Sequence, residues 1–171
     1  GKSLLVANYS GGSVTVLPIQ PEGRLGEATS FVQHQGASVN RQRQAGPHAH
    51  GVYLDASNRF ALVPDLGLDK VMVYRFSPEK GTIEANDPAW ATLKPGAGPR
   101  HLAFHPQGHY AYVINELHST IATFSYDPDR GALREVLLAR RPHRHGNRAH
   151  QADEQRGDLQ IRNQGRQIRR P

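Results

Sequence analysis

The chain contains no cysteine, which excludes a disulfide scaffold and any cysteine-ligated metal site. No apolar run approaches the roughly 18 residues of a membrane-spanning helix, so we expect neither such a helix nor a membrane partner. Methionine occurs once, at Met72, so we expect the chain to be a processed product or a fragment. Its 171 residues suit one ordinary domain.

Charge is distributed unevenly along the chain. The net charge of +6 at pH 7 would by itself suggest a nucleic-acid or membrane partner. Residues 1–136, however, carry 12 basic and 12 acidic residues, whereas residues 137–171 carry nine arginines against three acidic residues and supply the whole excess. The last aromatic residue is Tyr126. A neutral part that contains aromatic residues is therefore followed by a basic part without any.

The basic C-terminal part, residues 137–171, has few apolar residues, and these show neither helical nor strand spacing. Such a segment buries too little surface to offset its ordering entropy, so we predict disorder from about residue 140. An arginine-rich tail could bind nucleic acid through phosphate contacts, but it has no aromatic residue for base stacking. We therefore do not favour a nucleic-acid partner; the preferred interpretation is a stretch that never belonged to the fold, such as an out-of-frame end.

A motif repeats in residues 1–136. Each copy has a short apolar run, a polar turn, a second alternating run and a turn that contains proline and glycine; the copies are 4–25, 61–83 and 111–133. Val6, Val63 and Val113 are equivalent, at spacings of 57 and 50 residues. The longer first spacing includes a polar loop at about 34–46.

The repeat predicts four short antiparallel strands in each copy. In the third copy we expect them at about 101–105, 109–115, 120–126 and 133–138, where apolar and polar residues alternate. Four strands in about 50 residues indicate the blade of a β-propeller. A two-layer β-sandwich is the alternative, but it needs no such faithful repeat.

The predicted fold class is therefore all-β: a partial β-propeller of about two and a half four-stranded blades in residues 1–136, followed by a disordered basic tail in residues 137–171. Propellers have typically 4–8 blades, so this chain is too short to close the ring. Two apolar blade faces would remain in water. We expect marginal stability and self-association through these open faces.

Three ionisable residues interrupt the repeat near the expected channel mouth. Arg100 opens the innermost strand of the third copy; its equivalent is His50 if the strands are aligned and His48 if the Gly-Pro pairs are aligned. Glu116 follows the turn residue Asn115, where the other copies carry an apolar or aromatic residue. A histidine base, an arginine for an anion or oxyanion, and a glutamate suit acyl chemistry on an anionic substrate. The alternative is a set of solvated channel residues.

Other polar residues give weaker signals. His101 and His105 lie about 13 Å apart if they are on one strand, too far to share one metal ion, and we expect no metal. Asn8, Asp65 and Asn115 recur at one repeat position and are predicted to be turn residues.

Two long motifs stand out in the repeat, PHAHGVYLDASNRFALVPDLGLDKVMVYRF and PGAGPRHLAFHPQGHYAYVINELHSTIATF, together with the opening LLVANYSGGSVTVLPI. They resemble the lactonase family of seven-bladed β-propellers, which includes the bacterial propeller-type 6-phosphogluconolactonases and the fungal carboxymuconate-lactonizing enzymes. The resemblance covers residues 4 to about 136. It implies a cytoplasmic hydrolase of carbohydrate metabolism that needs no cofactor or metal and acts on an anionic sugar lactone such as 6-phosphogluconolactone.

In that family a histidine, two arginines and a glutamate converge at the channel mouth. The resemblance implies that His50, Arg100 and Glu116 are catalytic, and that His48, Arg100, His101 and Asn115 bind the substrate. The second family arginine belongs to a later blade, for which we find no equivalent here.

We therefore expect hydrolysis of a lactone, in which His50 or Glu116 takes a proton from the attacking water. Arg100 would bind the anionic end of the substrate or the oxyanion. The alternative is a non-enzymatic propeller module that binds partner proteins.

Overall fold

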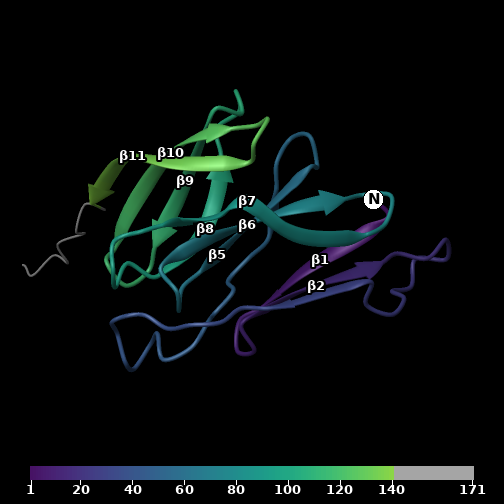
Figure 1. The fold of residues 1–171 in the computed structure, drawn as a ribbon, viewed down its shortest axis with the longest axis horizontal. Coiled ribbons are helices and arrows are strands. Elements are labelled where there is room, and N and C mark those ends of the chain that lie inside the picture. Colours follow the sequence, from purple (N-terminus) through teal and green to yellow (C-terminus); the bar gives the residue numbers. More distant parts are fainter. Residues whose placement is uncertain (141–171) are drawn as a thin grey trace, which may run out of the picture.

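The computed structural model describes residues 1–140, and the side chains of residues 1–136. In this part of the chain, eleven strands form three separate antiparallel sheets that lie side by side (Figure 1). The prediction of an all-β partial propeller is confirmed. The predicted disorder beyond about residue 140 lies outside the described residues.

The sheets follow one another along the chain. The first contains β1 (Ser3–Asn8), β2 (Ser13–Pro18) and β3 (Ser30–Gln33). The second contains β4 (Tyr53–Leu54), β5 (Phe60–Asp65), β6 (Lys70–Ser77) and β7 (Thr82–Thr92). The third contains β8 (Pro99–Phe104), β9 (Tyr110–Asn115), β10 (Thr120–Asp127) and β11 (Ala132–Arg140). In the third sheet each strand lies within two residues of its predicted bounds.

The expectation of four strands in every copy is wrong for the first sheet, which has three. Its strands β1, β2 and β3 correspond to β5, β6 and β7 of the second sheet. The innermost strands β4 and β8 come from residues upstream of the repeated segment. In addition, β4 has only two residues, so the innermost strand of the second sheet is shorter than that of the third.

The middle sheet is covered on both faces, and its sequence reflects this. All six residues of β5 are buried, because one face packs on Leu102 and Val113 of the third sheet and the other on Val14 and Val16 of the first. A strand buried on both faces is expected to be a continuous apolar run. In contrast, β9 alternates buried and exposed residues, because one of its faces has no described neighbour.

The two outer faces carry exposed apolar side chains. Leu4 and Phe31 lie on the first sheet, and Tyr110 and Tyr112 lie on the third. The predicted self-association through these faces is untested and stays a prediction. Within residues 1–140 there is no helix that is long and apolar enough to cross a membrane. The predicted boundary at residue 136 also stays a prediction, although β11 itself continues to Arg140.

The turn before the second strand of each repeated segment has the same backbone conformation. Gly12, Asp69 and Ser119 have φ angles of +61°, +53° and +52° and directly precede β2, β6 and β10. Asp and Asn tolerate this left-handed region better than most residues with a side chain. At this turn the carboxylate of Asp69 lies among neighbouring loops, where it accepts hydrogen bonds from Gln44 and Gly98.

Candidate active site

The strand pairing settles which histidine corresponds to Arg100. In the second sheet Leu54 pairs with Ala61, and in the third Phe104 pairs with Ala111. These pairs are related by a constant shift of 50 residues, and the same shift relates His50 to Arg100. His50 and Arg100 therefore occupy equivalent positions in adjacent sheets, as the strand alignment predicts.

The structure brings His50, Arg100 and Glu116 together. Arg100 Nε lies 3.0 Å from His50 Nε2 and 3.5 Å from Glu116 Oε2. Glu116 directly follows β9, and its backbone N–H donates to the carbonyl oxygen of Gly98 at 2.7 Å, just before β8. This bond ties the end of β9 to the start of β8, which places the carboxylate beside Arg100.

The His50 ring is held in its neutral form. The Arg100 Nε–H group can only donate, so His50 Nε2 accepts and the ring proton lies on Nδ1. Burial lowers the pKa of His50 below its usual value, and the positive charge of Arg100 lowers it further. A neutral imidazole near neutral pH is what a general base requires.

Sequence reasoning missed a second arginine of the site. Arg43 Nη2 lies 2.5 Å from Glu116 Oε1, so Glu116 binds Arg43 through one oxygen and Arg100 through the other. Arg43 lies in the polar loop at 34–46, which the repeat comparison treated only as an insertion. The available signal was the spacing: Val6 and Val63 are 57 residues apart, against 50 for the next pair.

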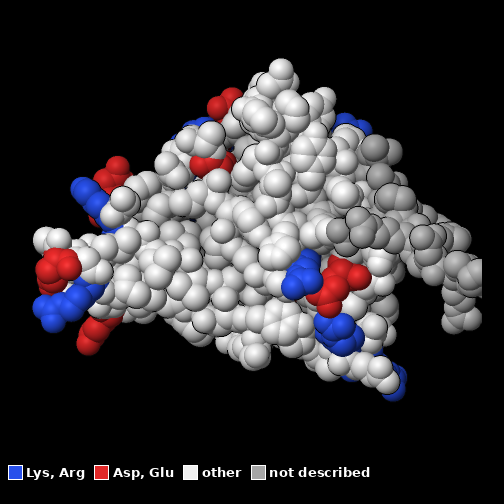
Figure 2. Space-filling view, turned by 180° about the vertical axis from the view of Figure 1, so that it is seen from behind, with Lys and Arg blue, Asp and Glu red and all other residues white. Residues whose placement is uncertain are grey.

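Arg43 also determines the ionisation of Glu116. The hydrogen bond from Arg43 is the largest factor that lowers the pKa of the Glu116 carboxyl, and the charge of Arg100 acts in the same direction. Glu116 therefore remains a carboxylate that orients two guanidinium groups. Figure 2 shows a face on which charged side chains form separate groups, several of which place acidic and basic side chains next to each other.

Aromatic rings also lie next to His50. The Tyr9 ring stacks on His48 at a centroid distance of 4.7 Å and meets the edge of His50 at 5.3 Å. His101 lies edge-on to His50 at 5.0 Å, and its Nδ1 is 2.9 Å from the Tyr53 hydroxyl. His101 thus adjoins the three residues, whereas His48 contacts Tyr9 and has no hydrogen bond to Arg100.

The predicted substrate-binding role of Asn115 does not fit its position. The residue is buried, and its Nδ2 group donates to the hydroxyl of Thr120 at 3.1 Å across the turn. Asn8 makes the equivalent bond to Ser13, and Asp65 accepts the backbone N–H of Gly67. All three hold turns, as their recurrence predicts, and we leave Asn115 out of the site.

No set of three or more His, Cys, Asp or Glu side chains within the described residues has the arrangement of a metal site. The positions of Arg43, Arg100 and Glu116 suit the binding of an anion. The exposed fractions are 44% for the Arg43 side chain, 47% for Arg100 and 26% for Glu116. Two half-exposed guanidinium groups and a neutral imidazole thus surround one carboxylate, with a net charge of +1.

The family described as "Lactonase, 7-bladed beta-propeller" matches residues 1–168. The chain belongs to this family. The match extends past residue 136, where the resemblance was expected to end. The predicted family membership is therefore confirmed.

Three lactonase relatives illustrate the similarity. The 6-phosphogluconolactonase of Bacillus subtilis is 38% identical over 135 residues, which cover 79% of this chain and 37% of that protein. The structure of the Pseudomonas aeruginosa periplasmic gluconolactonase is 38% identical, with a TM-score of 0.78 over 86% of this chain and 41% of that one. A putative 6-phosphogluconolactonase from Bacteroides fragilis is 35% identical, with a TM-score of 0.78 over 82% and 40%. This chain thus spans about two fifths of the length of these relatives.

Proposed function

We propose that this protein hydrolyses a sugar lactone, 6-phosphogluconolactone to 6-phosphogluconate, as a step of carbohydrate metabolism. The observation that carries the proposal is the contact of Arg100 with both His50 and Glu116. Relatives that are 33–38% identical carry the name 6-phosphogluconolactonase, which supports this substrate. The chemistry needs water and the three side chains, and no cofactor takes part.

His50 acts as the general base. Its Nε2 atom carries the basic lone pair and, because burial lowers its pKa, is deprotonated near neutral pH. Nε2 accepts a proton from a water molecule as the water oxygen attacks the lactone carbonyl carbon. Glu116 is the weaker candidate, because its two oxygens already bind Arg43 and Arg100 and its pKa is lowered.

Arg100 stabilises the negative charge that develops on the carbonyl oxygen. When substrate binds, the N–H group that donates to His50 in this structure turns to that oxygen. Glu116 holds the guanidinium in place. The tetrahedral intermediate then collapses, the ring C–O bond breaks, and the leaving ring oxygen takes the proton from His50. One water molecule is consumed, and the product is the open-chain hydroxy acid.

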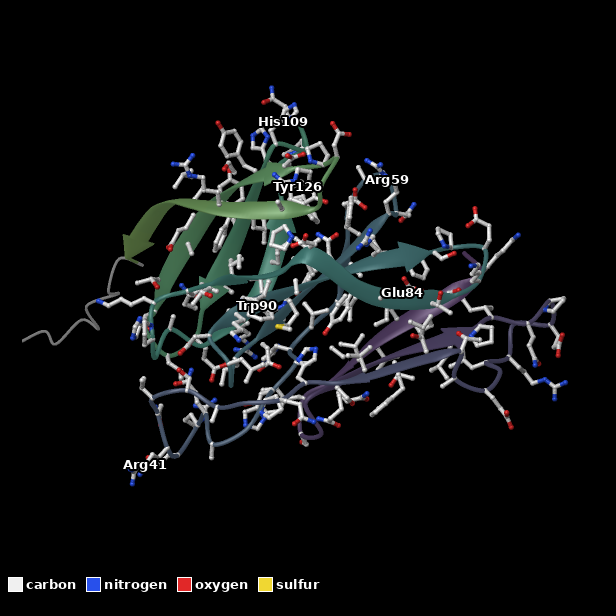
Figure 3. All side chains as sticks on the ribbon, viewed as in Figure 1. Arg41, Arg59, Glu84, Trp90, His109 and Tyr126 are labelled. Carbon is white, nitrogen blue, oxygen red and sulfur yellow. The ribbon has the colours of Figure 1, made fainter. Side chains whose placement is uncertain are left out.

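The test is the rate of hydrolysis of 6-phosphogluconolactone by the purified chain, corrected for spontaneous hydrolysis. His50→Gln and Arg100→Ala are expected to lower kcat/KM about 100-fold or more. His109→Gln is the matched control, because His109 lies at the opposite end of the third sheet from the Arg43 loop (Figure 3). Activity that survives both His50→Gln and Arg100→Ala would overturn the proposed site.

A parallel assay of the Bacillus subtilis relative measures what the remaining three fifths of such a protein contribute. The predicted cytoplasmic location stays a prediction, since the similar Pseudomonas aeruginosa protein is described as periplasmic.

A further inference from the structure

We propose that Arg43 is a binding residue of this site that receives the anionic group at the far end of the lactone and so selects charged lactones over neutral ones. This inference rests on the proposed function. Arg43 meets Glu116 across 73 positions of sequence, from a loop that only one copy of the repeat contains. An exposed ion pair of this kind is weak by itself, so the inference depends on what holds Arg43 in place.

The loop that carries Arg43 is anchored at the next residue. Gln44 is fully buried, and its Nε2 group donates to the carbonyl oxygen of Leu66 and to Asp69 Oδ1, both at 2.8 Å. Asn40 closes the turn from the other side, where its Oδ1 accepts the backbone N–H of Arg43 at 3.1 Å. The backbone at Arg43 is therefore fixed from both sides, while its side chain stays half-exposed.

The same buried carboxylate fixes the segment that leads to Arg100. Asp69 Oδ1 accepts the backbone N–H of Gly98 at 2.7 Å, two residues before Arg100, and Asp69 Oδ2 accepts that of Gly96 at 2.6 Å. Asp69 thus sets the distance between the two loops that supply the guanidinium groups. Because the buried carboxylate of Asp69 holds both loops, their backbones have the rigidity that a binding site requires.

Glu116 leaves both guanidinium groups with donors to spare. Each guanidinium has five N–H donors, and the contacts above use one from Arg43 and one from Arg100. The planar fork of an arginine matches the oxygens of a phosphate or carboxylate. Arg100 lies next to the base His50 and so faces the reacting carbonyl, whereas Arg43 binds the other oxygen of Glu116 and makes no hydrogen bond to His50 among the described residues. The end of the substrate that is remote from the carbonyl is therefore expected at Arg43.

The test measures binding of three open-chain acids by NMR titration of the isotope-labelled chain. Gluconate has no charge at the remote end, glucarate has a carboxylate there, and 6-phosphogluconate has a phosphate. In Arg43→Gln the affinity for 6-phosphogluconate is expected to fall about tenfold or more, the scale of one charge-assisted hydrogen bond, while that for gluconate is unchanged. Arg43→Lys, which keeps the charge, is expected to restore part of the loss.

Arg41→Gln is the matched control. It removes the same charge from the same loop, and Arg41 points outward from the loop, with no ion pair among the described residues (Figure 3). A fall for 6-phosphogluconate but not for glucarate assigns the site to phosphate, and an equal fall for both assigns it to oxyanions in general. An equal loss for all three acids in Arg43→Gln would overturn the inference, because it would mark Arg43 as a support for Arg100.

Failure of this inference can be told from failure of the proposed function. A chain without turnover whose 6-phosphogluconate binding depends on Arg43 contradicts the function alone. A chain with turnover in which Arg43→Gln and Arg41→Gln bind 6-phosphogluconate equally contradicts the inference alone. A wild-type chain that binds none of the three acids overturns the inference.

Discussion

Arg100 donates its Nε–H group to His50 Nε2 over 3.0 Å, and the two residues occupy the same repeat position in adjacent sheets. One position of a duplicated unit thus supplies an imidazole from one copy and a guanidinium from the next. Because Glu116 lies beside this pair, the titration of His50 depends on neighbouring charges of both signs.

The first prediction concerns this dependence. The carboxylate of Glu116 favours the protonated form of His50 and so raises its pKa, while burial and Arg100 lower it. Glu116→Gln removes the raising contribution, so the pKa of His50 is expected to fall further below its usual value. The measurement is an NMR titration of the His50 ring, with Glu84→Gln as the control for a lost exposed carboxylate. A higher or unchanged pKa in Glu116→Gln would contradict the charge arrangement.

The second prediction tests the backbone that joins Arg100 to Glu116. Gly98 has a φ of +63°, and an added Cβ would lie 2.6 Å from Cγ of Leu117. Gly98→Ala is therefore expected to lower stability and lactone hydrolysis together, because Gly98 also accepts the Glu116 N–H. Gly108→Ala separates the two causes: its φ is +76°, but nothing lies within 4 Å of the added atom. It should cost only the left-handed conformation, about 1–2 kcal/mol, and leave activity unchanged.

The third prediction concerns the buried carboxylate of Asp69. Asp69 accepts four hydrogen bonds with its two oxygens, from Ser38, Gln44, Gly96 and Gly98. Asp69→Asn keeps the shape but turns an N–H₂ group toward donors, so we expect a loss of about 1–3 kcal/mol in the free energy of unfolding. Urea denaturation measures it, with the exposed Glu79→Gln as control. An unchanged midpoint would show that the two loops do not depend on this carboxylate.

The repeat predicts the fold because each blade is encoded locally. Alternation in β9 and β10 and the turns between them depend on neighbours in sequence, so their bounds follow from the sequence. Of the two registers that the sequence leaves open, the strand alignment predicts that His50 and Arg100 meet, since equivalent positions of adjacent blades are neighbours in space. The three-stranded first sheet was not predicted, because the repeat comparison does not reveal which strand a copy lacks.

The longer first spacing marks the loop that carries Arg43, but it does not show that Arg43 reaches the site. Its position depends on Gln44 and Asp69, which are 25 residues apart in sequence and meet only in the folded chain. A polar loop such as 34–46 resembles any solvent-exposed insertion. For Asn115 the family resemblance implied a binding role, whereas the recurrence of polar residues at its repeat position predicted a turn residue; alternation along β9 places its side chain inward, in keeping with the turn.

The fourth prediction concerns the outer sheet faces. Phe31 is 60% exposed on the first sheet, and Tyr112 lies exposed on the third. Such apolar side chains favour contact between chains, so we expect the sedimentation coefficient to rise with protein concentration. Phe31→Glu and Tyr112→Glu are expected to reduce this rise, whereas Leu25→Glu, at an exposed residue next to the first sheet, should not. A chain that stays monomeric at all concentrations would contradict the prediction.

The fifth prediction compares two buried tyrosines, of which one has a hydrogen-bond partner for its hydroxyl and the other has none among the described residues. Burial raises the pKa of Tyr74 and of Tyr126 well above the usual value near 10. The Tyr74 hydroxyl lies 2.7 Å from Nε2 of the buried His34, whose Nδ1 contacts Asp65. The Tyr126 hydroxyl lies close enough to Asp55 for that charge to add to the shift, but it makes no hydrogen bond within the described part of the chain.

Both tyrosines make the fold sensitive to alkali. Above about pH 10 the unfolded chain releases the tyrosine proton while the folded chain retains it, so stability is complete below that pH and falls as the pH rises further. Tyr126→Phe should remove part of this fall and change stability at pH 7 by less than about 0.5 kcal/mol, because no hydrogen bond is lost. Tyr74→Phe should also reduce the fall but cost about 1–3 kcal/mol at pH 7, because the hydrogen bond between the Tyr74 hydroxyl and His34 Nε2 is lost. Urea denaturation at pH 7 and pH 11 measures both effects, and equal costs at pH 7 would contradict the assignment of the His34 contact.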